Sequence, residues 1–424
     1  MPLDRLNEVL RLQLVDIDGR GVAKRTESVI TSIVPATGAR GPRYLIEGDG
    51  SRAFLRMNSN GYLGMALRGP VVLAEERAAR AFGTGPQAVR FISGTYAPHV
   101  GLERRLARFH GREAAMIFSS AYGAVMGVLP ALVTSQTAVI SDELNHNCII
   151  NAVKLAQPGR KAVYRHLDVD ELERVIVDVA GSCRRVVVVS DGVFSMRGDN
   201  APLRRIQELV DAQDGRCGEN VLTLIDDSHG VGAFGATGRG TEEATGGRAD
   251  ILVATLGKAL GVNGGYVVGS QVLIDFLRET SPFYVYSNPI TPAEAAAAEA
   301  ALDLLDSPAG LALLAHLRAM TQRFKAGLVA SGFETVVGDH PVVPVLTRDT
   351  DLTRRLARHL RDRGVLATGL SYPVVPRGQE EIRFQVSADH TEADIDEALD
   401  ALSSWTPIPT PIPRDGVARP GDDR

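Results

Sequence analysis

Short apolar, β-branched runs alternate with helix-forming stretches from Asn60 to about residue 290. The runs that we expect to form buried strands are residues 115–120, 138–141, 162–167, 185–190, 221–226, 250–256 and 264–270. Between them, 103–111, 169–180 and 203–213 have the apolar spacing of helices. Strands that alternate with helices over roughly 200 residues predict a mainly parallel sheet covered by helices, which is an α/β fold.

The pattern changes near residue 290. Residues 291–307 form a strong helix-forming segment, which we expect to connect to a second, smaller domain. That domain contains strand patterns at 341–346 and 381–387 and helix patterns at 353–364 and 392–405, the last capped by Thr391. We therefore expect an N-terminal arm with one amphipathic helix (1–59), a large domain (60–295), a small C-terminal α+β domain (296–405) and a disordered, Pro-rich tail (406–424).

Composition and charge narrow the class of protein. The chain has 424 residues, of which 44% are hydrophobic and 23% charged, as in a soluble globular enzyme. A formal net charge of -5 gives no electrostatic reason to expect nucleic acid or membranes as partners. The three cysteines are far apart and form no Cys-x-x-Cys pair, which argues against a disulfide framework or a zinc site. No signal peptide is visible, so we expect a cytoplasmic protein. We also expect no bound metal.

The segment LIDDSHGVGAFG (224–235) contains Gly230, Gly232 and Gly235 at the spacing of a dinucleotide-binding loop. Such a loop requires a helix that begins directly after the glycines and meets the pyrophosphate. Residues 236–247 are instead rich in further glycines and have no periodic apolar face. The sequence therefore argues against a nicotinamide or flavin oxidoreductase.

The residues before these glycines carry more chemical information. Asp226 and His229 follow an apolar strand, and Lys258 follows another, with Gly257 and Gly261 around it. The C-terminal ends of parallel strands are where open α/β sheets bind ligands. A lysine is costly there unless it is paired, exposed or used. Pyridoxal phosphate (PLP) chemistry uses a strand-end lysine as a Schiff base and a strand-end carboxylate that pairs with the pyridine nitrogen.

With these residues, the chain resembles the α-oxoamine synthases, a branch of the fold-type I PLP enzymes, from about Asn60 to Ser403. The matching segments are NGYLG, VRFISGT, SDELNHNCII, SDGVFSM, LIDDSHGVGAFGATGRG, TLGKALG, YSNPITP and SYPVVPRGQEEIRFQVSADHT. The glycine C-acetyltransferase subgroup is most similar. The resemblance implies an acyltransferase that condenses a small amino acid, glycine by default, with an acyl thioester such as acetyl-CoA, another acyl-CoA or an acyl carrier protein.

The resemblance also implies roles for the residues around the cofactor. Lys258 would form the Schiff base and later remove the α-proton. Asp226 would pair with the pyridine nitrogen, and His229 would hydrogen-bond the ring's phenolic oxygen. His146 would stack on the ring and help place the acyl group. Ser195 matches another cofactor-contacting position.

Further roles concern the phosphate and the substrate. Backbone N–H groups of Ala121 and Tyr122, together with the Thr255 hydroxyl, would hold the phosphate. The resemblance further implies that Ser287 and Asn288 reach the phosphate of the neighbouring subunit, which would require a homodimer with shared active sites. The positions that match the family's binders of the amino-acid carboxylate are Asn60 and Arg383.

Several alternatives stay open at this level. Arg383 could simply pair with Glu380 or Glu381, and His146 could be a core histidine. An aminotransferase or a retro-aldol lyase could be built on the same fold. A non-catalytic partner subunit is disfavoured because Lys258 is present.

Overall fold

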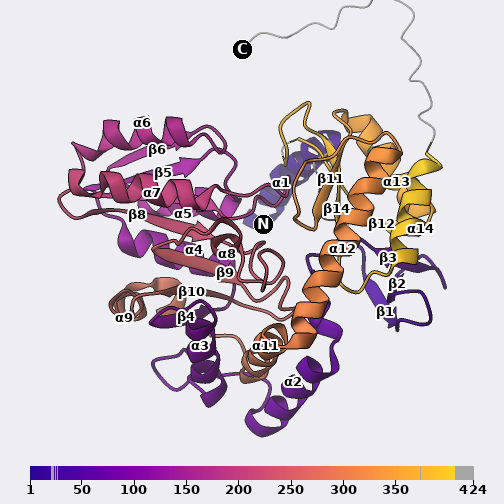
Figure 1. The fold of residues 1–424 in the computed structure, drawn as a ribbon, viewed down its shortest axis with the longest axis horizontal. Coiled ribbons are helices and arrows are strands. Elements are labelled where there is room, and N and C mark those ends of the chain that lie inside the picture. The colour runs from indigo at the N-terminus through magenta and orange to yellow at the C-terminus, as the bar shows by residue number, and fades with distance from the viewer. Residues whose placement is uncertain (21–22, 24, 26, 373, 406–424) are drawn as a thin grey trace, which may run out of the picture.

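The computed structural model describes residues 1–20, 23, 25, 27–372 and 374–405 (Figure 1). The tail expected over 406–424 lies outside the described residues.

A seven-stranded sheet in the order β4-β10-β9-β8-β7-β5-β6 is the centre of the larger part of the molecule. Its strands are β4 (Ala114–Phe118), β5 (Thr137–Asp142), β6 (Arg160–Tyr164), β7 (Arg185–Asp191), β8 (Asn220–Asp226), β9 (Ile251–Thr255) and β10 (Gly265–Gly269). The pairs from β6 to β9 are parallel, and β10 runs antiparallel to both of its neighbours. Each apolar run singled out above forms one of these strands, which confirms the α/β fold.

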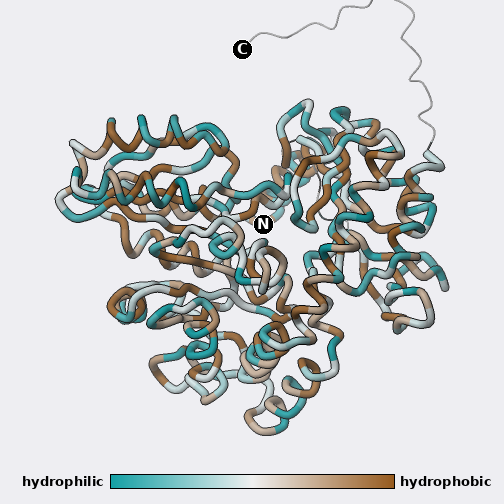
Figure 2. The backbone as a smooth tube through the Cα atoms, in the orientation of Figure 1, coloured by the Kyte–Doolittle hydropathy of each residue, from teal (hydrophilic) through white to brown (hydrophobic). Residues whose placement is uncertain are grey.

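Helices cover both faces of the sheet, and this explains why the strands are apolar at successive positions. Along β7, Val187 and Val189 pack in the core under α4 (Ala121–Leu132) and α5 (Asn147–Ala156). Val186 and Val188 pack on the other face against α6 (Val169–Ala180) and α7 (Leu203–Gln213). Figure 2 shows hydrophobic and hydrophilic residues alternating along these outer helices, as expected for helices with one solvated face.

The remaining helices frame the sheet and lead to the C-terminal part. They are α2 (Gly69–Phe82), α3 (Ala97–Phe109), the short α8 (Thr241–Thr245), α9 (Gln271–Thr280), α10 (Pro282–Val285), α11 (Pro292–Leu305) and α12 (Pro308–Ala330), with 3-10 turns at Met65–Leu67 and Asp214–Arg216. Thr291 caps α11 with a capping box that includes Glu294. The long α12 then runs toward the second sheet (Figure 1).

The C-terminal part is built on a three-stranded antiparallel sheet, β11-β14-β13. Its elements are β11 (Val342–Leu346), α13 (Thr350–Asp362), β12 (Val365–Leu366), β13 (Thr368–Leu370), β14 (Glu381–Gln385) and α14 (Glu392–Ser403). The Thr391 side chain accepts a hydrogen bond from the Asp394 N–H at the start of α14, as the sequence predicts.

The segment before Asn60 differs in structure from a simple arm. Helix α1 (Pro2–Gly19) has no buried residue, because nothing in the described chain covers its apolar face. Three strands that the sequence analysis did not predict follow it: β1 (Ile30–Val34), β2 (Arg43–Ile46) and β3 (Ala53–Arg56). They form a sheet with β12, and Arg43 pairs with buried Asp394 at 2.7 Å. These strands are short and pair with one another, and distant partners hold the group in place: β3 pairs with β12, and Arg43 of β2 bonds Asp394, each more than 300 residues away in sequence.

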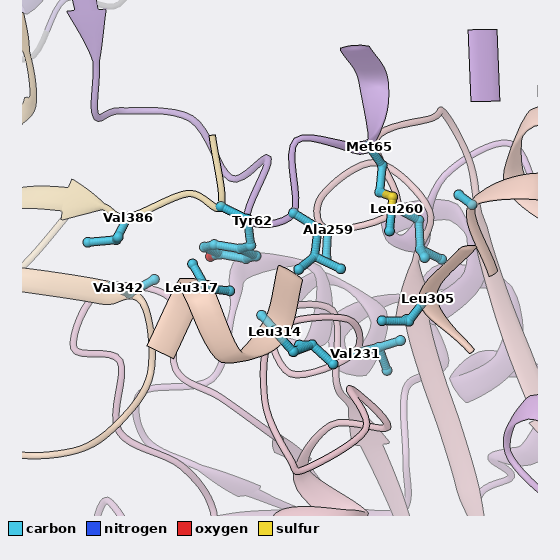
Figure 3. Close-up of a cluster of buried hydrophobic side chains, with 14 of the residues drawn as sticks. Tyr62, Met65, Val231, Ala259, Leu260, Leu305, Leu314, Leu317, Val342 and Val386 are labelled. Atoms are coloured by element: carbon cyan, nitrogen blue, oxygen red, sulfur yellow. The ribbon is translucent and has the colours of Figure 1, made fainter. Parts of the chain in front are cut away.

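One continuous apolar cluster joins the two parts and holds the loops that carry the candidate chemistry. Figure 3 shows Tyr62 and Ala259 packed with Leu314 and Leu317 of α12 and with Val342 and Val386 near the C-terminal sheet. Ala259 is adjacent to Lys258, so this packing fixes the loop after β9. No single helix of the described chain is long and apolar enough to cross a membrane, although α11 and α12 pass that test together as a pair bent by 78°.

Candidate active site

A cavity of about 260 Å³ lies at the C-terminal ends of β7, β8 and β9, where an open α/β sheet places its ligands. Its walls bring together eight of the residues named from the sequence: Ala121, Tyr122, His146, Ser195, Asp226, His229, Thr255 and Lys258. Four residues that the sequence analysis did not single out complete the polar lining: Ser120, Cys148, Asp191 and Ser228.

Lys258 projects from the loop after β9 and is the cationic group of this cavity. Burial lowers the pKa of its amine, while the negative charges of Asp226 and Asp191 oppose that change. A lowered pKa leaves more of the amine neutral, and the neutral amine is the nucleophile that Schiff-base chemistry needs. Gly261, with a φ of +71°, turns the loop beside Ala66, whose nitrogen would lie 2.4 Å from an added Cβ.

Two carboxylates lie side by side opposite the lysine. Asp226 and Asp191 are paired residues at the ends of the adjacent parallel strands β8 and β7. Asp226 Oδ1 accepts from the Ser228 N–H at 3.0 Å, and Asp191 Oδ2 accepts from the His146 N–H at 3.0 Å. Burial and the charge of Asp226 raise the pKa of Asp191 well above its usual value. The sequence carried a signal for Asp191, because it ends an apolar strand in the same way as Asp226.

His229 is hydrogen-bonded to a buried tyrosine. The Tyr62 hydroxyl lies 2.7 Å from His229 Nδ1, and burial raises the pKa of Tyr62, so this hydroxyl stays protonated and can donate to the ring. Burial and the charge of Lys258 lower the pKa of His229 well below its usual value. A neutral imidazole whose Nδ1 accepts carries its proton on Nε2. His340 Nε2 lies 2.9 Å from the His229 carbonyl oxygen, which fixes the backbone of the loop.

His146 is exposed toward the cavity, so it is not a core histidine. It is the N-cap of α5, where its Nδ1 accepts from the Cys148 N–H at 3.2 Å. Burial against its neighbours lowers the pKa of its ring, with Asp226 acting in the opposite direction. Its imidazole therefore stays neutral and available to contact a planar ring.

Asn60 and Arg383 lie beside the cavity and do not line it. Arg383 Nη1 donates to the Ser195 carbonyl oxygen at 3.0 Å, and Ser195 does line the cavity. In the amide orientation that satisfies its neighbours, the Gln385 oxygen accepts from Arg383 Nε and Nη2 at 2.9 and 3.0 Å. The same side chain lies 3.2 Å from Asn60 Oδ1. Gln385, which the sequence analysis missed, thus joins the two residues expected to bind a carboxylate.

Among the described residues Arg383 forms no ion pair with a neighbouring glutamate, although the charge of Glu381 opposes the lowering of its pKa by burial. The Glu380 carboxylate accepts from the Gly378 N–H at 2.8 Å and the Thr350 hydroxyl at 3.1 Å. Oε1 of Glu381 has no hydrogen-bond partner in the described chain. The Arg383 guanidinium therefore keeps donor capacity for a ligand.

Ser287 and Asn288 follow α10 and are outside the walls of this cavity. Asn288 is exposed, and Tyr286 beside it is 78% exposed. The structure of one chain thus does not bring these two residues to Lys258.

Gly230 of the glycine motif and Gly240 after it pack against a buried carboxylate. Asp227 is fully buried and accepts from the Thr241 N–H and hydroxyl at 2.7 and 2.6 Å. A Cβ at Gly230 or Gly240 would lie 2.1 or 2.0 Å from an Asp227 carboxylate oxygen, so only glycine allows the backbone to wrap around it. Burial raises the pKa of Asp227 to about 7. The short α8 begins at Thr241, so the helix of a dinucleotide site does not follow Gly235.

The residues of the cavity fit PLP. Helix α4 begins at Ala121, and the first N–H groups of a helix have no partner within it, which suits a phosphate. Gly265 lets β10 approach this helix start, because a Cβ there would lie 2.2 Å from the Ala121 nitrogen. The Ser228 hydroxyl is buried in the wall without a partner among the described residues. An amine, a carboxylate and a helix start thus surround one space, as an aldehyde, a pyridine nitrogen and a phosphate require.

Known proteins share this fold and these sequence features. Residues 52–402 match the family described as aminotransferase class I and II. The chain is 40% identical over 403 residues to the mitochondrial 2-amino-3-ketobutyrate coenzyme A ligase of Bos taurus, covering 94% of this chain and 92% of that protein. It is also 40% identical over 368 residues to 8-amino-7-oxononanoate synthase 1 of Bacillus velezensis, covering 86% and 90%. A solved structure of serine palmitoyltransferase with PLP superposes with a TM-score of 0.82 at 25% identity, covering 95% and 97%.

A match of this extent, together with the lysine and the carboxylate at the strand ends of this chain, places the chain in one branch of that family. The chain belongs to the α-oxoamine synthases of the aminotransferase class I and II family, which are fold-type I, PLP-dependent acyltransferases that condense an amino acid with an acyl thioester.

Proposed function

We propose that this protein condenses glycine with an acyl-CoA to give a 2-amino-3-oxo acid, which is released intact or after decarboxylation, with acetyl-CoA as the default donor. The observation that carries the proposal is the meeting of Lys258, Asp226, His229 and His146 in one cavity, with Arg383 bound to the wall residue Ser195. The identity of 40% to 2-amino-3-ketobutyrate coenzyme A ligase supports glycine and acetyl-CoA as the first pair to test.

In this proposal, Asp226 would hold the pyridine nitrogen of PLP and Lys258 would hold its aldehyde group. His229 would hydrogen-bond the phenolic oxygen, and the start of α4 with Thr255 would hold the phosphate. PLP, when bound, supplies an electron sink that makes the α-carbon of the amino acid acidic. His146, at the start of α5, would contact the ring.

The chain's own residues then bind and move protons. Arg383 and Asn60 bind the amino-acid carboxylate, and a planar guanidinium suits that group. The Lys258 amine, whose pKa is lowered by burial, accepts the α-proton. His146 orients the acyl carbonyl for attack at the α-carbon. Asp191 positions His146 by accepting its N–H.

The proposed enzyme is a homodimer in which Ser287 and Asn288 complete the partner's phosphate site. Asn288 is exposed, Ser287 is half-buried, and neither lines the cavity of Lys258 in its own chain, which fits this role. Phe91 and Ile92, within VRFISGT, are 67% and 68% exposed, and exposed apolar side chains of this size favour a protein interface. We further propose a cytoplasmic enzyme that binds neither nucleic acid nor membranes, although the Bos taurus relative is mitochondrial.

A thiol-release assay with an array of amino acids and acyl thioesters, read by mass spectrometry of the products, tests this function. Lys258→Ala should abolish both thiol release and the visible absorption of PLP joined to the protein. Lys161→Ala, at an exposed position on β6, is the matched control and should change neither. Failure of every amino acid and thioester pair would refute the proposal. Pyridoxamine formation from an amino donor would instead indicate an aminotransferase, and aldehyde release from a β-hydroxy amino acid would indicate a lyase.

A further inference from the structure

Of the three cysteines in the chain, only Cys148 lines the cavity that contains Lys258. It is the second residue of α5 and is 2% exposed, because it packs in the apolar cluster between this helix and the sheet. Among the described residues it has no disulfide partner and belongs to no group that could hold a metal ion. The chemistry left to this thiol is nucleophilic attack or hydrogen bonding.

The protonation state of Cys148 decides between these two roles. Burial raises the pKa of its thiol, and the negative charges of Asp226 and Asp191 raise it further. A cysteine attacks as the thiolate, and the raised pKa keeps Cys148 in the thiol form at neutral pH. The side chain is therefore not a nucleophile, and it has one proton to donate.

Two groups of the candidate active site lie within reach of that proton. Sγ of Cys148 lies 3.0 Å from His146 Nδ1 and 3.5 Å from Asp226 Oδ2. A neutral imidazole has one acceptor nitrogen, and His146 Nδ1 already accepts from the Cys148 N–H at 3.2 Å. In the part of the chain that the structure describes, Asp226 Oδ2 accepts from no other donor. The geometry therefore directs the thiol proton to Asp226.

This hydrogen bond means that Asp226 is held at both of its carboxylate oxygens. Oδ1 accepts from the Ser228 N–H at 3.0 Å, and Oδ2 accepts from the thiol. The first donor belongs to the loop after β8 and the second to α5, so two separate elements fix the plane of the carboxylate. A carboxylate has about four acceptor positions, so Asp226 can still accept from a ligand. A carboxylate that is already oriented loses less freedom when that ligand binds.

We propose that Cys148 is a positioning residue whose thiol donates to Asp226 Oδ2 and holds the carboxylate in the orientation that pairs with the pyridine nitrogen of PLP. This assignment rests on the role of Asp226 in the proposed function, and it adds the group that orients Asp226. The backbone N–H of the same residue caps His146. One residue at the start of α5 thus orients two of the side chains around the cofactor.

Spectroscopic titration with PLP tests the assignment by removing the donor and then restoring it. Cys148→Ala should raise the Kd for PLP by about three- to tenfold, the effect of losing one hydrogen bond from a weak donor to a charged group. Cys148→Ser keeps a donor and should return the Kd to within about twofold of the native value. Cys183→Ala is the matched control, because Cys183 does not line the cavity, and it should leave the Kd unchanged.

A double-mutant cycle separates positioning from simple packing. In the Asp226→Asn background, Cys148→Ala should change the Kd for PLP by less than about twofold, because the carboxylate that the thiol orients is gone. A packing defect left by the lost sulfur atom would persist in that background. Urea denaturation of all four proteins shows whether the two substitutions affect stability independently of PLP affinity.

The S–H stretching band in the infrared spectrum reports the hydrogen bond directly and does not depend on activity. Cys183→Ala combined with Cys217→Ala leaves Cys148 as the single thiol of the chain. Donation to a carboxylate lowers the stretching frequency of an S–H bond. Adding Asp226→Asn to this PLP-loaded protein should therefore move the band to higher frequency. A band that does not move would assign the proton to His146 and overturn the proposal.

Three results of the binding experiments would also overturn it. The first is an unchanged Kd in Cys148→Ala, and the second is a Kd in Cys148→Ser as high as that in Cys148→Ala. The third is a loss from Cys148→Ala that is equally large in the Asp226→Asn background. Each of them leaves thiol release and the proposed function intact. An unchanged PLP affinity in Asp226→Asn alone would instead refute the role of Asp226, on which both proposals depend.

Discussion

His166 fastens the loop that carries Ser195, and its charge should stabilise the fold in a pH-dependent way. Its Nδ1 lies 3.0 Å from Asp142 Oδ1 and its Nε2 lies 3.2 Å from Asp199 Oδ2, so both ring nitrogens face carboxylates. Its ring also packs edge-on against Phe194, with centroids 4.4 Å apart. Although burial lowers the pKa of His166, the two carboxylates outweigh it and raise the pKa from 6.5 to about 9.

The size of the effect follows from that rise. One pKa unit corresponds to about 1.4 kcal/mol, so the charged His166 contributes up to about 3 kcal/mol. Because the pKa is raised in the folded state, the contribution is complete below pH 6.5 and is lost as the pH rises through about 9. His166→Gln should therefore lower the free energy of unfolding by about 2–3 kcal/mol at pH 6 and by less than about 1 kcal/mol at pH 9.5.

Urea denaturation of the PLP-loaded protein at both pH values measures this difference. His99→Gln is the control, because burial lowers the pKa of His99 and its ring bonds to the Ile290 carbonyl oxygen at 2.8 Å. The cost of that substitution should persist at pH 9.5. An equal cost of His166→Gln at both pH values would refute the argument that the paired carboxylates hold a charged histidine.

Three further predictions concern the cofactor, the glycine loop and a helix cap. Asp226→Asn should weaken PLP binding by roughly tenfold or more in a spectroscopic titration, because a neutral amide no longer favours the protonated pyridine; unchanged affinity would contradict the pairing. Gly240→Ala, at φ +82° and against Asp227, should destabilise the fold by more than about 3 kcal/mol. Gly50→Ala, at φ +62° with nothing within 4 Å, should cost only about 1 kcal/mol, and similar losses would refute the steric argument. Thr391→Ala should cost about 1 kcal/mol in thermal unfolding through loss of the α14 cap, and no change would show that the cap is dispensable.

The sequence by itself determined the large sheet and the chemical identity of its ligand edge. Strands that are buried on both faces can be recognised in the sequence because consecutive residues are apolar, as along Val186–Val189 of β7. Asp226 and Lys258 stand out because charged groups directly after such runs are costly unless they are used. The local sequence also indicates that no helix begins directly after Gly235, so it argues against a dinucleotide site without help from the tertiary structure.

Tertiary structure alone decided which distant residues meet. Tyr62 reaches His229 across 167 positions, Gln385 lies against Asn60 across 325, and β3 pairs with β12. No local periodicity encodes such contacts, because they depend on how the chain closes on itself. The same holds for Glu381. In the sequence it is one acid in a strand, and only the folded chain buries it and leaves its Oε1 without a hydrogen-bond partner among the described residues. This burial raises the pKa of its carboxyl group to about 8.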